Sequence, residues 1–171
     1  GSARVDSLRG AIDAVTHGRH TPRNEQGGAG IQEDDVPPRP ALTFQNPILL
    51  AAGTAAYGRE LDGVIALDAL GGLITKAVSP EPRPGAGAPR VADFDGGMIN
   101  AVGLANPGVD EVRARELPWL AAALRRARVL VNVVGRVVED FGEGGARLDD
   151  APGVDGYELN VSCPNTRAGG L

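Results

Sequence analysis

The chain has 171 residues, 42% of them apolar, 23% charged and 4% aromatic, which is enough to bury one hydrophobic core. A formal net charge of −5 argues against a general affinity for nucleic acid, and no apolar run approaches the roughly 20 residues needed to span a bilayer. The single cysteine, Cys163, excludes an internal disulfide and no Cys/His grouping has zinc-site spacing, so we expect a cytoplasmic protein with no bound metal, nucleic-acid partner or membrane partner.

The first 40 residues differ in composition from the rest. They contain the glycine-rich segment 27–30 and the proline-rich segment 37–40, and they hold few apolar residues that could offset the entropy of ordering. We therefore expect residues 1–40 to be a disordered tail or a non-native extension, and residues 41–171 to be the folded part. Because the only methionine is Met98, we also expect the chain to be a piece of a longer protein.

From residue 41 onward, short apolar runs alternate with segments of helical spacing. The runs expected to form strands are 47–53, 73–78, 129–135 and 157–161. The expected helices are 59–70, a helix that Asn106-Pro107 begins and Pro118 interrupts before it continues to about Ala127, and a weaker, glycine-containing helix at 137–150. A proline- and glycine-rich excursion occupies 80–98.

This alternation predicts an α/β fold with parallel strands and crossover helices. Four strand–helix units in the folded part correspond to the N-terminal half of a (β/α)8 TIM barrel, since a complete barrel needs about 250 residues. A doubly wound sheet is the structural alternative. The absence of a G-x-G-x-x-G motif after the first run counts mildly against a dinucleotide fold.

Polar residues gather toward the C-terminal ends of the predicted strands, where barrel enzymes build their active sites. Lys76, Asn132, Asn160 and Cys163 all lie there. In the fourth strand, an alternation of period two places positions 158, 160 and 162 on one face and positions 157, 159 and 161 on the other.

Several of these residues suit a flat, polar and anionic ligand. A lysine among apolar strand residues needs a partner such as an anion, although Lys76 also fits a frayed strand end. The amides of Asn100, Asn160 and Asn165 can donate and accept simultaneously, which suits a ring with alternating C=O and N–H groups. Gly96-Gly97 and Gly103 allow close backbone approach, whereas Asn106 is better explained as a helix cap.

Taken together and in order, the motifs of residues 41–171 resemble those of dihydroorotate dehydrogenase. The motifs are Asn46-Pro47-Ile48, Ala51-Ala52-Gly53-Thr54, Ile74-Thr75-Lys76, Glu81-Pro82-Arg83-Pro84-Gly85, Gly96 through Leu104, Asn106-Pro107-Gly108, Asn132, and Glu158 through Asn165.

The resemblance implies an FMN-containing (β/α)8 barrel that oxidises dihydroorotate to orotate in pyrimidine biosynthesis. Cys163 stands where the class 1 enzymes carry their cysteine base, and positions 96–104 are most similar to the NAD-linked subfamily. In that subfamily the catalytic chain works with a second subunit that holds FAD and an iron–sulfur cluster. The resemblance thus implies a homodimer or a heterotetramer for the full-length protein.

The resemblance also implies roles for individual residues. As a thiolate, Cys163 would remove a proton from C5 of dihydroorotate while hydride leaves C6 for N5 of the flavin, and Lys76 would lie near both molecules. The implied substrate-binding residues are Lys76, Asn100, Val102, Gly103, Leu104, Asn160 and Asn165. The implied FMN-binding residues are Ala51, Ala52, Gly53, Lys76, Asn132 and Asn160.

Some features depart from the family or leave other functions open. Ala52 replaces the serine usual in the family, and the later strands that bind the FMN phosphate would follow residue 171. A dihydropyrimidine dehydrogenase-like barrel shares the cysteine loop but usually has histidine where Asn165 stands. A cysteine hydrolase would need a histidine partner, and both histidines lie in the first 40 residues. A non-catalytic half-barrel is the remaining alternative.

Overall fold

A computed structural model describes residues 42–161 of the chain. Cys163, Asn165 and the expected domain boundary at residue 40 lie outside the described residues.

The centre of the fold is a parallel sheet of four strands. They are β1 (Leu49–Leu50), β2 (Gly72–Ile74), β5 (Arg128–Val134) and β6 (Gly156–Asn160), and they lie side by side in that order. A doubly wound sheet reverses its strand order next to the first strand, whereas the wall of a (β/α)8 barrel adds each strand beside the preceding one. The observed order is that of a barrel wall, so the doubly wound alternative is wrong. All four predicted strands are present, the first two shorter than expected.

The two faces of the sheet differ in chemistry, as alternation along a strand requires. Val129, Val131 and Val133 of β5 belong to the hydrophobic core under the helices. Tyr157, Leu159 and Val161 of the last strand and its end pack against the same core. Positions 132, 158 and 160 therefore share the opposite face, the inner face of the barrel wall, as predicted for 158 and 160.

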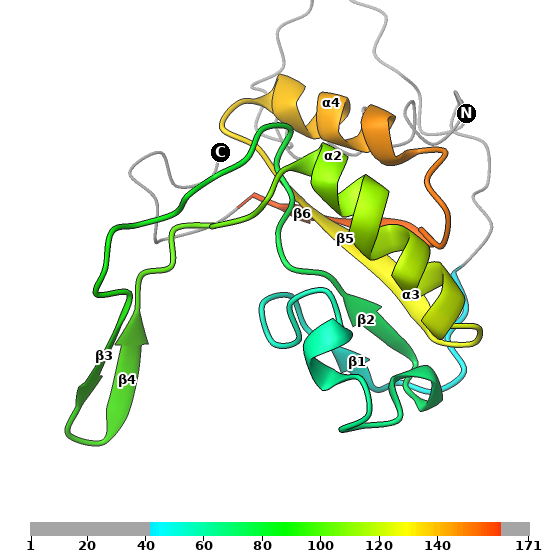
Figure 1. The fold of residues 1–171 in the computed structure, drawn as a ribbon, viewed down its shortest axis with the longest axis horizontal. Coiled ribbons are helices and arrows are strands. Elements are labelled where there is room, and N and C mark those ends of the chain that lie inside the picture. The colour runs from blue at the N-terminus through cyan, green and yellow to red at the C-terminus, as the bar shows by residue number, and fades with distance from the viewer. Residues whose placement is uncertain (1–41, 162–171) are drawn as a thin grey trace, which may run out of the picture.

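Three helical segments follow one another after β4. They are α2 (Val109–Glu111), a π-helical segment (Val112–Glu116) and α3 (Leu117–Ala123). A further helix, α4 (Val138–Leu148), follows β5. Figure 1 shows α3 and α4 lying along the β5–β6 part of the sheet. The core between helices and sheet holds the fully buried side chains of Leu117, Leu120, Phe141 and Leu148. Burial of this apolar face is the main source of the fold's stability.

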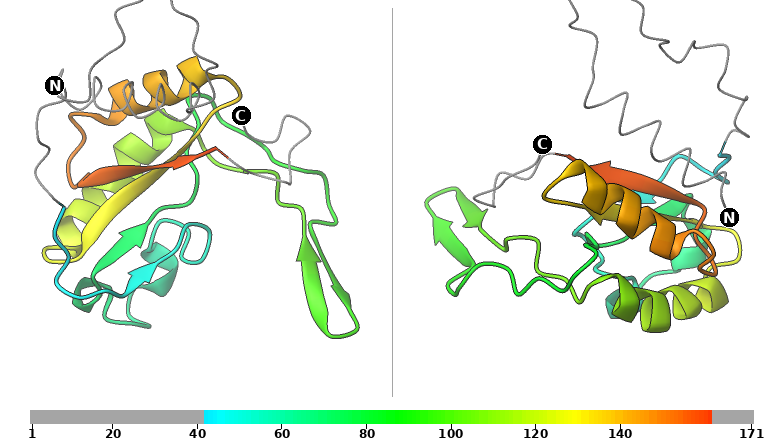
Figure 2. Two further views of the ribbon diagram at one scale, coloured as in Figure 1. Left: turned by 180° about the vertical axis from the view of Figure 1, so that it is seen from behind. Right: turned by 90° about the horizontal axis from the view of Figure 1, so that it is seen from above.

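A two-stranded antiparallel hairpin projects from the sheet. It consists of β3 (Val91–Phe94) and β4 (Gly97–Asn100). Figures 1 and 2 show from three directions that it stands clear of the four-stranded sheet. The sequence patterns did not predict this hairpin. Its turn explains Gly96-Gly97, which were predicted to allow approach of a ligand: Gly96 has a φ of +85°, and the ring of Phe94 covers the position where a Cβ of Gly97 would lie.

The predicted helix at 59–70 is wrong. The segment forms two short 3-10 turns, η2 (Arg59–Leu61) and η3 (Leu67–Ala69). Gly63 has a φ of +75°, which a continuous right-handed helix excludes. The apolar spacing is also misleading, because Val64 is 72% exposed and does not pack on the core.

The helix after residue 106 differs from the prediction in two ways. It begins at Val109, with Gly108 as its N-cap, so Asn106 is not the cap. It also continues past Pro118 and ends at Ala123, short of Ala127. A proline removes one helical hydrogen bond and clashes with the carbonyl four residues earlier. The helix is π-helical over the five residues immediately before Leu117, and a π-helical turn is wider than an α-helical one. This local widening allows the helix to continue through Pro118 without a break.

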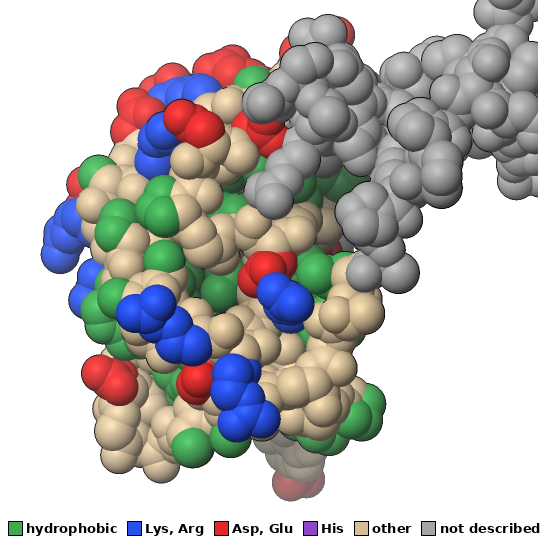
Figure 3. All heavy atoms as spheres, turned by 90° about the vertical axis from the view of Figure 1, so that its right-hand side faces the viewer, with side chains coloured by type: hydrophobic (Ala, Val, Ile, Leu, Met, Phe, Trp, Pro, Cys, Tyr) green, Lys and Arg blue, Asp and Glu red, His purple; other side chains and the backbone are tan. Residues whose placement is uncertain are grey.

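Charged side chains on the surface are mixed rather than segregated. On the face drawn in Figure 3, basic and acidic groups alternate over the described residues without forming a single-sign patch. Arg147, for example, contacts Asp110 at 2.6 Å and Glu143 at 3.1 Å. Within residues 42–161, none of the helices has the length and apolar character that crossing a membrane requires.

Candidate functional site

The carboxyl ends of the four parallel strands meet at one edge of the sheet, and most residues predicted to be functional lie there. Ala51, Ala52 and Gly53 directly follow β1, and Lys76 lies two residues beyond β2. Asn132 is in the second half of β5, and Asn160 is the last residue of β6. Because parallel strands present their carboxyl ends on the same side, the topology gathers these positions from four separate segments.

A pocket of about 270 Å³ lies at this edge. It is lined by Ala52, Asn132, Glu158, Leu159, Asn160 and Val161. Three predicted site residues, Ala52, Asn132 and Asn160, thus contribute to one pocket. Glu158 also lines it, although the sequence analysis assigned it no role.

Three side chains in the pocket are connected by hydrogen bonds. Asn132 and Glu158 are direct register partners across the parallel β5–β6 pair. The Asn132 Nδ2 group donates to Glu158 Oε1, and Asn160 Nδ2 donates to Asn132 Oδ1 over 3.4 Å. The second of these bonds is at the long end of the usual range.

The backbone on both sides of Asn132 is fixed. Its N–H donates to Thr75 Oγ1 at 3.2 Å, and its carbonyl accepts the N–H of Val78 at 2.8 Å. Thr75 is fully buried and Asn132 is 2% exposed. The backbone of Asn132 is therefore fixed by the segment that follows β2, and its buried side chain has little room to turn.

The predicted substrate loop at Val102–Leu104 has an unusual backbone. Gly103 and Leu104 have φ values of +71° and +58°, and a positive φ is rare for a leucine. A Cβ on Gly103 would lie 2.7 Å from the backbone nitrogen of Ala86. No hydrogen bond found among residues 42–161 uses the N–H groups of Gly103 and Leu104. As far as the described residues go, these two successive backbone donors can bind an anion.

The loop is held in place by Asn106, which is 7% exposed. Asn106 Nδ2 donates to the carbonyl of Leu104 at 2.8 Å and to Ser79 Oγ at 2.9 Å. Its Oδ1 accepts the N–H of Gly108 at 2.9 Å. Asn106 thus joins this loop to the segment after β2. The sequence analysis predicted Asn106 only as a helix cap and not in this positioning role.

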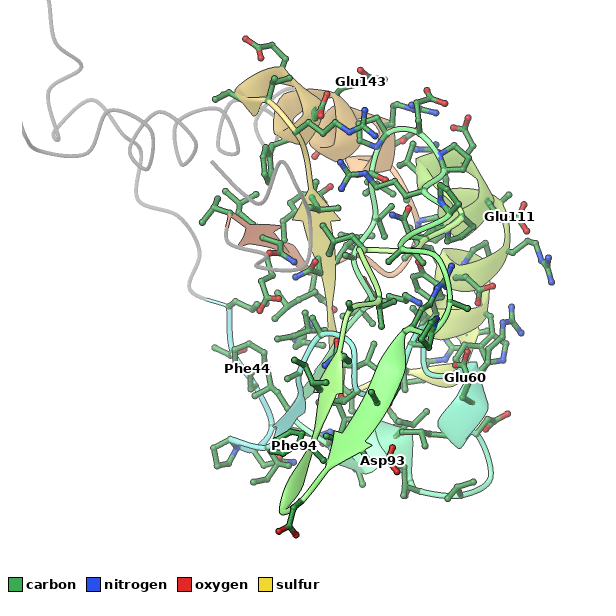
Figure 4. The ribbon with its side chains drawn as sticks, turned by 90° about the vertical axis from the view of Figure 1, so that its left-hand side faces the viewer. Phe44, Glu60, Asp93, Phe94, Glu111 and Glu143 are labelled. Carbon is green, nitrogen blue, oxygen red and sulfur yellow. The ribbon has the colours of Figure 1, made fainter. Side chains whose placement is uncertain are left out.

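The structure does not bring all the predicted residues together. Asn100 lies at the end of β4, opposite Val91 in the hairpin, and is not among the residues that line the pocket. Asp93 and Phe94, near the tip, point in different directions (Figure 4). Lys76 is half-buried, and its N–H donates to the carbonyl of Ala56 at 2.8 Å, but it does not line the pocket.

Two residues of the site, Glu158 and Thr75, were missed by sequence reasoning. The alternation in the last strand placed position 158 on the same face as Asn160, which was the available signal. Thr75 carried no comparable signal, because its contact with Asn132 depends on the register between β2 and β5. In the part of the chain that the structure describes, no group of three or more His, Cys, Asp or Glu side chains is arranged to hold a metal ion.

Comparisons with known proteins agree with this geometry. The family model for dihydroorotate dehydrogenase matches residues 39–171. The chain is 46% identical over 132 residues to the catalytic subunit of dihydroorotate dehydrogenase B (NAD(+)) from Anoxybacillus flavithermus, covering 77% of this chain and 42% of the relative. It is 42% identical to the protein of the same name from Latilactobacillus sakei, covering 77% of this chain and 43% of the relative. The chain thus spans less than half the length of these curated relatives.

A solved structure shares the fold. The crystal structure of DHODH from Eimeria tenella in complex with ferulenol has a TM-score of 0.60 and 26% sequence identity, covering 74% of this chain and 36% of that chain. The sheet described above is accordingly the N-terminal half of a (β/α)8 barrel. Together with the family match over residues 39–171, these likenesses place the chain in the dihydroorotate dehydrogenase family.

Proposed function

We propose that this chain is the N-terminal part of an enzyme that oxidises dihydroorotate to orotate in pyrimidine biosynthesis, with FMN as cofactor. The observation that carries the proposal is the convergence of Ala52, Asn132 and Asn160 on one pocket at the carboxyl edge of a parallel sheet. The names and identities of the relatives support the same reaction.

The pocket suits the ring system of FMN. Its lining is uncharged except for Glu158, whose carboxylate is hydrogen-bonded to Asn132. Amide groups can donate and accept, as the alternating C=O and N–H groups of a flavin require. At the neighbouring Gly53, where φ is +81°, a Cβ would meet no atom within 4 Å, so the backbone there is open to a flat ligand. FMN, when bound, supplies the hydride acceptor at its N5.

The residues of this chain bind and orient the substrate in the proposal. Asn100, Asn160 and Asn165 hold the pyrimidine ring through their amides. The backbone N–H groups of Gly103 and Leu104 receive the carboxylate, with Val102 completing the loop. The available donors and the positive φ values at this loop support that role.

Proton removal is assigned to Cys163, which follows the end of β6 by three residues. Its thiolate takes the proton from C5 while hydride leaves C6. A free thiol has a pKa of about 8.5, so the rate of this step should rise with pH until the thiolate is fully formed. Lys76, at the carboxyl end of β2, provides a cation near the anionic substrate and the flavin.

A second subunit completes the electron path in the proposal. The relatives are named catalytic subunits of an NAD(+)-dependent enzyme. We infer a partner that carries FAD and an iron–sulfur cluster and passes electrons to NAD. With this partner the catalytic chain forms a heterotetramer, and without it a homodimer.

The test uses the full-length protein. It should purify yellow, and anaerobic addition of dihydroorotate should bleach its flavin absorbance. Cys163→Ala should retain the flavin but be reduced at least about a hundredfold more slowly, as expected for loss of a general base. The exposed Glu139→Gln change, on α4, serves as control and should leave the rate unchanged. A colourless protein would exclude the proposed reaction, and normal reduction of Cys163→Ala would exclude the thiol as base.

A further inference from the structure

We propose that Glu158 is a positioning residue that sets the hydrogen-bond polarity of the pocket, and thereby decides which groups Asn160 presents to the pyrimidine ring. This inference rests on the proposed function for the identity of the ligand. Its structural basis is the chain of contacts from Glu158 through Asn132 to Asn160.

Glu158 determines the orientation of the Asn132 amide. A carboxylate only accepts hydrogen bonds, so the Nδ2 group of Asn132 must face it. The backbone of Asn132 is held by Thr75 and Val78 and the residue is 2% exposed, so the side chain has little room to turn away from this partner. Without the carboxylate, the two orientations of the Asn132 amide would differ little in free energy, because an amide has both donors and acceptors.

The orientation of Asn132 in turn determines that of Asn160. Because Nδ2 of Asn132 faces Glu158, its Oδ1 faces the pocket and accepts from Asn160 Nδ2. Asn160 is then left with its own Oδ1 and one N–H to present to a ligand. If Asn132 were reversed, two amide nitrogens would face each other and Asn160 would have to rotate. The acceptor and the donor that it presents would then exchange places.

The register of the sheet shows that Glu158 is suited to this role. It lies directly opposite Asn132, and Asn160 follows two residues later on the same face of β6. Glu158 also lies in the pocket lining, where burial of a charge without a partner is costly. Its hydrogen bond to Asn132 satisfies the carboxylate and fixes the amide at the same time.

The test measures orotate binding to the full-length, FMN-loaded protein, from the change in flavin absorbance. Glu158→Met conserves volume but removes the acceptor, and the dissociation constant for orotate should rise about tenfold or more, the discrimination expected when buried polar groups lose their partners. Glu158→Gln can still accept through one of its two amide orientations, and the rise should be only about two- to threefold. Thermal melting of each variant checks that the fold is retained.

The graded order of the two variants separates positioning from other roles. If Glu158 only filled space, Glu158→Met would bind orotate like the wild type; if it acted only by charge, Gln and Met would be equally impaired. Either result overturns the inference. Glu139→Gln and Glu139→Met, at an exposed position of α4, are the matched controls and should change nothing. If the wild type binds FMN and orotate and both Glu158 variants bind orotate with the wild-type dissociation constant, this inference alone is refuted. If the wild type binds neither molecule, the proposed function is refuted with it.

Discussion

The carboxylate of Asp68 accepts a hydrogen bond from the backbone N–H of Arg126 at 2.7 Å, across 58 positions of the sequence. The same oxygen accepts the N–H groups of Arg125 at 2.8 Å and Ala127 at 3.0 Å. Asp68 lies just before β2, and residues 125–127 lie just before β5. The contact therefore ties together the amino ends of two neighbouring strands, at the edge of the sheet opposite the pocket.

We predict that Asp68→Asn lowers the free energy of unfolding by about 1 kcal/mol. Asparagine keeps the shape and one acceptor but loses the charge, and hydrogen bonds to a charged group are the stronger kind, here partly screened by solvent. Urea denaturation at neutral pH measures the loss. Orotate binding should not change, because Asp68 is remote from the pocket lining.

The contribution of Asp68 should also depend on pH. The backbone N–H groups of Ala127 and Arg126 lower the pKa of Asp68 below its ordinary value of 3.8. A lowered folded-state pKa means that the stabilisation is complete above the pKa of an unfolded aspartate and is lost as the pH falls through the folded-state pKa. The difference in stability between wild type and Asp68→Asn should therefore shrink below about pH 4. An equal difference at pH 3 and pH 7 would contradict this account.

Tyr57→Phe is predicted to leave the free energy of unfolding unchanged or to raise it by up to about 1 kcal/mol. The hydroxyl of Tyr57 is buried and has no hydrogen-bond partner among the described residues. Burial, with Glu116 and Glu60 adding to it, raises the pKa of Tyr57 well above its ordinary value, so the group stays neutral. Removing a buried hydroxyl without a partner removes a desolvation cost.

The other tyrosine provides the matched control. The hydroxyl of Tyr157 donates to the carbonyl of Gly145 at 3.4 Å. Tyr157→Phe should therefore destabilise the protein by about 0.5 kcal/mol, the lower end of the range for a neutral hydrogen bond. Thermal melting of both variants gives the comparison, and a larger loss from Tyr57→Phe than from Tyr157→Phe would show that Tyr57 has a partner.

Gly142→Ala should raise the free energy of unfolding by about 0.5–1 kcal/mol, because alanine loses less backbone entropy in a helix interior than glycine does. Gly142 lies within α4, and a Cβ there would meet no atom within 4 Å. Gly144→Ala, in the same helix, should bring no gain, because its Cβ would lie 3.1 Å from Cγ1 of Val133. Equal gains at both positions in chemical denaturation would show that Val133 moves aside freely.

Gly103→Ala should weaken orotate binding by the full-length protein about tenfold or more. At a φ of +71° the new side chain is strained by about 1 kcal/mol, and its Cβ would lie 2.7 Å from the backbone nitrogen of Ala86, so the loop must shift. Gly96→Ala has a similar φ of +85° but open space around it. The control should show the strain in its melting temperature and leave the dissociation constant for orotate unchanged.

Local patterns were sufficient to predict some of the regular elements, but not the β3–β4 hairpin or the 3-10 turns within 59–70. The near-continuous apolar run at 129–135 and the alternation at 157–161 correspond to β5 and β6, and the expected helix at 137–150 corresponds to α4. These predictions were correct because each segment packs apolar residues against the core at regular intervals, which produces a periodic pattern in the sequence. At 59–70 the apolar spacing was helical, but Val64 and Ile65 are exposed, and Gly63 with its positive φ interrupts the segment.

The motifs that span residues 41–171 were enough to identify the family, and the amino-acid pattern also located polar residues at the strand ends. The three-dimensional fold was needed to establish that the strands lie in barrel order, that Asn100 is outside the pocket lining, and that Glu158 and Thr75 contact Asn132. A motif depends only on residues that are neighbours along the chain. Register and strand order depend on which distant segments pair with each other, and that pairing cannot be seen in the sequence of either segment alone.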